Sequence, residues 1–109
     1  MRCLIKASMP VDSGNQAAAS GTLGKTIQKI LADLKPEAAY FGEENGKRTA
    51  FLIVDLQDVS EIPKVAEPWF LAFNASVEFH PVMTIEDLAK AAPHIEGAVR
   101  KYATAGRQA

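Results

Sequence analysis

The chain has 109 residues, the usual length of one domain, and its formal net charge of −1 provides no positive field that would draw it to nucleic acid or an anionic membrane. A single cysteine, Cys3, and two histidines exclude an intrachain disulfide framework and leave few zinc ligands. Lys6 interrupts the first apolar stretch, and no apolar run approaches the roughly 20 residues that span a bilayer. We therefore expect one cytoplasmic domain over residues 1–109, with no metal, cofactor, nucleic-acid partner or membrane span.

The first expected elements are a strand and a helix. Residues 2–9 are mostly apolar and end at Pro10 and the turn-prone residues 12–15, which predicts a strand. From about Gln16, apolar residues recur at helical spacing until Pro36 stops them. The helical stripe consists of Leu23, Ile27, Ile30, Leu31 and Leu34.

Residues 36–43 and 48–56 are predicted to form a β-hairpin around the turn sequence Glu-Asn-Gly. The second strand is apolar on both sides of its alternation, whereas a strand with one face in water alternates apolar and polar residues. We therefore expect both faces of this sheet to be covered. Helices can cover one face, and a second copy of the chain is the expected cover for the other.

A second helix is predicted over residues 62–73, from an apolar stripe of nearly helical period. Asp58 or Ser60 can cap it, and Asn74 is expected to end it. Pro68 lies inside the pattern and predicts either a kink or a helix in two pieces.

The last expected elements are a strand and a helical extension. Residues 75–82 alternate as a strand, in which Pro81 requires an edge position or a bulge. Thr84, with a carboxylate three residues later, marks a helix start, and Pro93 is expected to break that helix. A final helical segment over residues 94–104 and a frayed tail are expected to follow.

The order of elements is β-α-β-β-α-β, the ferredoxin-like pattern. We therefore predict an α+β fold with a four-stranded antiparallel sheet. Its core is expected in about residues 1–83, and the helical extension in about residues 84–104.

One motif resembles a nucleotide-binding loop but does not fit one. Residues 19–26 match G-x-x-x-x-G-K-[ST] except at the first position, and Asp55 could hold magnesium. A phosphate-binding loop leaves a strand directly, whereas about ten residues intervene here. We instead expect Gly21 and Gly24 to lie on the helix and let it approach the sheet closely, with Lys25 in solvent.

A candidate acid–base pair lies on the last predicted strand. Alternation places Glu78 and His80 on the open face of the sheet, together with Lys6 and Ser8 of the first strand. A histidine near a carboxylate can act as a general acid or base at neutral pH. The same pair can equally be an interface contact, and both interpretations remain open.

The remaining candidates are aromatic and amide residues. Trp69 lies at helical spacing, where filling the core is the default role and lining a pocket is the alternative. Tyr40 and Asn74 could offer a hydroxyl and an amide to such a pocket. The candidate ligand-binding residues are thus Trp69, Asn74, Tyr40 and His80, of which His80 and Tyr40 are the candidate catalytic groups. Cys3 is expected to be a buried structural residue.

Trp69, Phe73 and the sequence Val-Glu-Phe-His-Pro-Val of residues 77–82 resemble small uncharacterised bacterial ferredoxin-like proteins of the dimeric α/β-barrel superfamily. The resemblance covers about residues 1–90. It implies a homodimer in which two sheets pair face to face.

Some members of that superfamily are monooxygenases that act on polycyclic aromatics or haem, with an asparagine, a tryptophan and a histidine or tyrosine in the cleft. The resemblance implies such roles for Trp69, Asn74, Tyr40 and His80. In the haem-degrading members the asparagine lies in the first strand, and residues 2–9 contain none.

Two functions from different classes follow. The first is an uncharacterised dimeric protein that binds a small organic ligand in a cleft between helices and sheet. The alternative is a cofactor-light monooxygenase or isomerase acting on an apolar cyclic substrate, which needs a titratable group within hydrogen-bond reach of the substrate.

Overall fold

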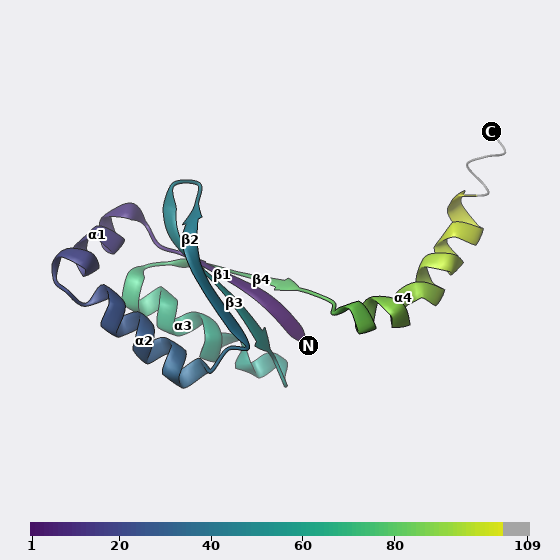
Figure 1. Ribbon diagram of the computed structural model, residues 1–109, viewed down its shortest axis with the longest axis horizontal. Coiled ribbons are helices and arrows are strands. Elements are labelled where there is room, and N and C mark those ends of the chain that lie inside the picture. Colours follow the sequence, from purple (N-terminus) through teal and green to yellow (C-terminus); the bar gives the residue numbers. More distant parts are fainter. Residues whose placement is uncertain (104–109) are drawn as a thin grey trace.

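The computed structural model describes residues 1–103, and its sheet is four-stranded and antiparallel with the order β2-β3-β1-β4. The strands are β1 (Arg2–Ser8), β2 (Ala38–Glu44), β3 (Lys47–Asp55) and β4 (Ser76–Pro81). The helices are α1 (Val11–Ala19), α2 (Leu23–Leu34), α3 (Ile62–Phe73) and α4 (Ile85–Ala98), with single turns η1 (Val59–Glu61) and η2 (Val99–Ala103). Helices α1–α3 lie on one face of the sheet, and α4 leads away from it (Figure 1). The predicted α+β ferredoxin-like fold with a C-terminal helix is confirmed.

The core lies between the sheet and the three helices. Cys3, Ile5 and Ala7 of β1 face the helices and are buried, as are the residues directly opposite them on β3. Trp69 and Phe73 of α3 pack over this face, with ring centroids 6.2 Å apart. Complete burial of a large apolar side chain stabilises a fold by about 1.5–3 kcal/mol, so these side chains hold the layers together.

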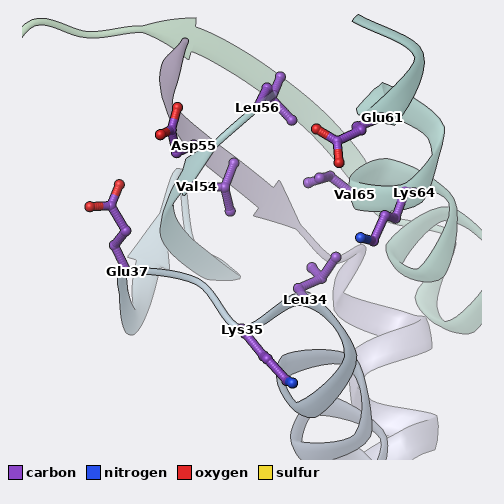
Figure 2. Close-up of a pocket in the computed structure, with 9 residues that line it drawn as sticks. All are labelled: Leu34, Lys35, Glu37, Val54, Asp55, Leu56, Glu61, Lys64 and Val65. Carbon is purple, nitrogen blue, oxygen red and sulfur yellow. The ribbon is translucent and has the colours of Figure 1, made fainter. Parts of the chain in front are cut away.

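The core reaches the end of β3. Val54, Leu56 and Val65 are buried there, and Leu34 packs against the same cluster (Figure 2). Because these residues come from β3, α2 and α3, they join the two longer helices of this face to the sheet.

Helix α1 begins at Val11, so the prediction of a turn followed by a helix from Gln16 is wrong. Ser13 Oγ donates hydrogen bonds to the carbonyl oxygens of Pro10 and Phe73, at 3.2 and 2.7 Å. Gly14 is buried beside Arg48, whose Nη1 would lie 2.7 Å from a Cβ at that position. These tertiary contacts outweigh the local turn preference of the sequence.

The predicted role of the two glycines in helix packing is also wrong. Gly21 has a φ of +76° and lies in the turn between α1 and α2, whereas Gly24 lies in the first turn of α2. A Cβ on either glycine would meet nothing within 4 Å, so neither makes a close approach. Lys25 is exposed, as predicted.

Two prolines lie inside helices that do not break. Pro68 is in the interior of α3, so the two-piece version of that prediction is wrong. Pro93 lies inside α4, which runs on to Ala98, so the predicted break there is wrong as well. A proline removes one helical hydrogen bond, at a cost of about 3 kcal/mol, and a helix can continue where its other turns offset that loss.

The other local signals behave as expected. Asn45 and Gly46 have φ of 54° and 76°, which is the turn geometry that suits the twist of a hairpin. Asn74 ends α3 in the left-handed conformation, with a φ of 53°. Pro81 lies on β4, an edge strand, where its missing N–H is tolerated.

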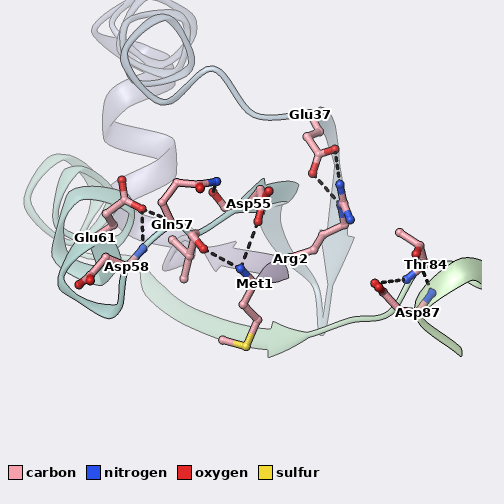
Figure 3. Close-up of polar contacts among 10 residues, drawn as sticks. Met1, Arg2, Glu37, Asp55, Gln57, Asp58, Glu61, Thr84 and Asp87 are labelled. Atoms are coloured by element: carbon pink, nitrogen blue, oxygen red, sulfur yellow. Dashed lines mark hydrogen bonds and ion pairs between the residues drawn. The ribbon is translucent and has the colours of Figure 1, made fainter. Parts of the chain in front are cut away.

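Side chains cap two of the helical segments (Figure 3). Asp58 Oδ1 accepts a hydrogen bond from Ser60 N at 2.8 Å, and Glu61 reciprocates by accepting from Asp58 N at 3.2 Å. Asp58 rather than Ser60 is therefore the cap, but it caps η1, and α3 itself begins without a side-chain cap. Thr84 and Asp87 form the same reciprocal arrangement at the start of α4.

Ion pairs fasten the beginning of β1 (Figure 3). Arg2 donates to both carboxylate oxygens of Glu37, at 2.8 and 3.1 Å. The N-terminal ammonium of Met1 donates to Asp55 Oδ1 at 3.2 Å and to the carbonyl oxygen of Leu56 at 2.6 Å. These contacts connect β1 to the segment before β2 and to the end of β3.

Helix α4 contributes nothing to the core, because none of its residues is buried. Its apolar residues and those of η2 are exposed: Ile85, Leu88, Ile95, Val99 and Tyr102. The tail predicted beyond η2 lies outside the described residues. Within the part of the chain that the structure describes, no helix is both long and apolar enough to span a membrane.

Substituting the two glycines separately tests the turn between α1 and α2. Gly21→Ala is expected to lower the free energy of unfolding by about 1 kcal/mol, because an alanine with positive φ is strained. Gly24→Ala is the matched control and is expected to raise it by up to about 1 kcal/mol, since alanine favours a helix. Urea denaturation measures both values. Stabilisation by both substitutions would mean that the two glycines share one helix.

The Arg2–Glu37 pair predicts a pH dependence of stability. Hydrogen bonds from Arg2 lower the pKa of Glu37 below its ordinary value of 4.5. A lowered pKa stabilises the fold above that ordinary value, and the contribution is lost as the pH falls through the lowered one. Wild type should therefore be more stable than Glu37→Gln at pH 7, and the difference should shrink below pH 4.5 in urea denaturation. In an Arg2→Gln background, a difference that shrinks in the same way would show that the pair is not its source.

Candidate functional site

The face of the sheet opposite the helices is covered by no other described element (Figure 1). Its centre is apolar, because Leu4 of β1 pairs directly with Ile53 of β3, and Phe51 of β3 pairs with Tyr40 of β2. Leu4, Phe51 and Ile53 are half-buried, whereas Tyr40 is 70% exposed. We call this surface, with the strand residues of the same parity, the open face.

Two pairs of polar side chains contact each other on the open face. Lys6 Nζ lies 2.6 Å from Glu44 Oε1, and this hydrogen bond raises the pKa of Lys6. On β4, His80 Nε2 lies 2.9 Å from Glu78 Oε1, so the two candidate residues do contact each other. The Lys6–Glu44 ion pair balances its own two charges within the sheet, which lowers the cost of covering that part of the face.

Tyr40 and His80 share the open face but lie at opposite edges. Tyr40 is on β2 and His80 is on β4, with β3 and β1 between them. Neighbouring strands are about 4.8 Å apart, so three strand spacings separate the two by about 14 Å. Within one chain they do not act on the same small molecule.

Trp69 and Asn74 lie on the helical side of the sheet. Trp69 has an exposed fraction of 0%, and its indole Nε1 has no hydrogen-bond partner among the described residues. Asn74 is exposed at the end of α3. The four candidate residues are therefore divided between two faces of the sheet. Cys3 is a free, buried cysteine, as predicted.

A small hollow of about 170 Å³ lies at the end of β3 (Figure 2). Its base is the apolar group described above, and charged residues stand at its rim: Lys35, Glu37, Asp55, Glu61 and Lys64. The three carboxylates are already bonded to Arg2, to the N-terminal ammonium and to backbone N–H groups. The hydrogen bonds and ion pairs of these carboxylates therefore stabilise the fold.

A second hollow, of about 310 Å³, lies between α1 and the end of α3. Asn74 lines it, together with Ser13, Ser20 and Thr22. Ser13 is bonded to the Phe73 carbonyl, and the Ser20 and Thr22 hydroxyls lie 2.8 Å apart. Most of the hydroxyl groups that line this hollow thus already form hydrogen bonds within the protein.

The third hollow is an apolar cleft of about 300 Å³ between α2 and the β2–β3 hairpin. We call it the α2 cleft, and its lining residues are Met9, Leu23, Ile27, Phe41, Gly42, Arg48 and Thr49. The volume is at the lower end of the range for small-molecule sites, and such sites combine an apolar lining with a few polar groups. Arg48 is the one charged residue of the lining.

Sequence reasoning missed the α2 cleft. Leu23 and Ile27 belong to the predicted helical stripe, and both pack against the core but are only half-buried. Phe41 pairs with Ala50 and therefore faces the helical side, yet it is 52% exposed. An aromatic residue on the covered parity of an edge strand is the signal that could have indicated an incompletely filled space.

The described residues include no group of three or more His, Cys, Asp or Glu side chains placed to hold a metal ion. The α2 cleft and the open face are the two candidate sites for binding.

No curated protein matches the chain. Residues 1–95 match a sequence family that is described as a domain of unknown function, DUF3303. The matched segment includes the whole sheet, the α2 cleft and most of α4. The chain therefore belongs to the DUF3303 family.

Proposed function

We propose that this protein is a homodimer of the dimeric α/β-barrel type that holds a small organic molecule in the α2 cleft of each copy. The observation that carries the ligand proposal is the cleft itself, an apolar space of about 300 Å³ between helix and sheet with a single charged residue in its lining. The buried free thiol of Cys3 fits a reducing compartment, so the proposal places the protein in the bacterial cytoplasm.

The open face supports the dimer part of the proposal. Helices cover only one face of the sheet, and Leu4, Phe51 and Ile53 leave an apolar centre on the other (Figure 1). A stable interface buries about 800 Å² on each partner, with an apolar centre and a polar rim. The Lys6–Glu44 ion pair and the hydrogen-bonded Glu78–His80 pair supply polar groups for such a rim.

The alternative of a cofactor-light monooxygenase or isomerase needs an aromatic wall beside a titratable group. Trp69 is fully buried and lines none of the three hollows described above. The His80–Glu78 pair lies on the opposite side of the sheet. No observation on this chain favours the enzyme over the binding protein.

Disruption of the open face tests the dimer. Ile53→Asp is expected to convert the protein to a monomer, because two aspartates would be buried without partners in a symmetric interface. Leu71→Asp is the matched control, since Leu71 is 80% exposed on α3, and it should leave the mass unchanged. Light scattering coupled to size-exclusion chromatography measures the mass. A dimeric Ile53→Asp protein would place the interface elsewhere.

Filling the α2 cleft tests the ligand. Native mass spectrometry of the protein as purified should find a small-molecule adduct that denaturing conditions remove. Ile27→Trp is expected to abolish the adduct, because the larger side chain occupies the cleft, whereas Leu71→Trp should retain it. An adduct of unchanged mass and occupancy in Ile27→Trp would mean that the molecule binds at another place.

A further inference from the structure

We infer that the molecule held in the α2 cleft is an apolar monocarboxylic acid whose carboxylate binds Arg48. This inference rests on the proposed function of the cleft and adds the chemical class of its ligand.

Arg48 is positioned by its neighbours and left without a counter-charge. Its Nη1 donates a hydrogen bond to Asn15 Oδ1 at 3.0 Å, and the guanidinium lies against α1 at Gly14, where a Cβ would crowd it. Asn15 is a neutral acceptor, so this bond orients the guanidinium and leaves its charge uncompensated. Among residues 1–103, Arg48 forms no ion pair.

The nearest carboxylate by strand register is already used. Glu43 lies directly opposite Arg48 on β2, but its Oε2 accepts a hydrogen bond from Gly46 N at 3.0 Å in the hairpin turn. A guanidinium has five N–H donors, and only one of those on Arg48 has a described partner. Because Arg48 lines the cleft and is exposed, its remaining donors are accessible to an anion there.

The other lining residues favour a ligand whose uncharged part is apolar. Met9, Leu23, Ile27 and Phe41 are apolar, and Arg48 is the single charged residue among the lining residues. A guanidinium binds a planar carboxylate through two parallel hydrogen bonds. One positive charge matches one carboxylate, whereas a phosphate monoester would carry nearly two negative charges. An aliphatic or aromatic acid with one carboxylate therefore fits both the charge and the apolar space.

The test compares two probes of the same shape, 2-naphthoate and its uncharged amide, 2-naphthamide, by titration calorimetry with the purified dimer after removal of bound ligand. The wild-type protein should bind the acid about tenfold or more tightly than the amide, which is the usual effect of a hydrogen bond to a charged group. Arg48→Gln should weaken acid binding by about the same factor and leave amide binding unchanged. Retained amide binding also shows that the variant still folds and keeps its cleft.

Lys29→Gln is the control for net charge, because Lys29 is exposed on α2 and does not line the cleft. It should leave binding of both probes unchanged. Equal affinity of wild type for acid and amide, or acid binding unaffected by Arg48→Gln, would overturn the carboxylate inference while the cleft remains a ligand site. Failure of both probes to bind, together with the absence of any adduct in native mass spectrometry, would overturn the proposed function itself.

Discussion

The structure depends on a sheet that has helices on one face only. Alternate residues of β1 and β3 bury their side chains against α1–α3, and the intervening ones, Leu4, Phe51 and Ile53, form the apolar centre of the open face. Burial of apolar area is the main favourable term in folding and association, so an apolar sheet face is stable only when something covers it. A second copy of the same face would provide that cover, which is why the proposed assembly is a homodimer.

Strand β3 connects the two proposals. Phe51 and Ile53 project to the open face, whereas Arg48 lies on the helical parity of the same strand and lines the α2 cleft. Dimerisation would fix the position of β3 from one side, and the core would fix it from the other. Because β3 and its hairpin partner β2 form one wall of the cleft, the proposed interface would also hold that wall in place. The proposed ligand site and the proposed dimer face would thus use opposite sides of one β-hairpin.

Much of the fold could be predicted from the sequence, because periodicity and turn chemistry are local. The apolar run of residues 48–56 indicated a strand with apolar residues on both of its faces, and Asn74 and Pro81 marked a helix end and an edge strand. The errors arose where distant contacts decide the structure. Bonds from Ser13 and the packing of Arg48 on Gly14 make a helix from a sequence that locally favours a turn. The α2 cleft was missed because its walls come from α2, β2 and β3, and spacing along the chain does not show how completely they pack.

The most direct test of the account is the environment of the open face in solution, measured by isotope-filtered nuclear Overhauser effects. In a sample that mixes ¹³C-labelled and unlabelled copies, contacts between the two are seen separately from contacts within one. The account predicts intermolecular contacts between the Ile53 methyl groups of one copy and Leu4, Phe51 or Tyr40 of the other. Intermolecular contacts confined to α4 or to the helical face, or none at all, would contradict the claim that a second copy covers the open face.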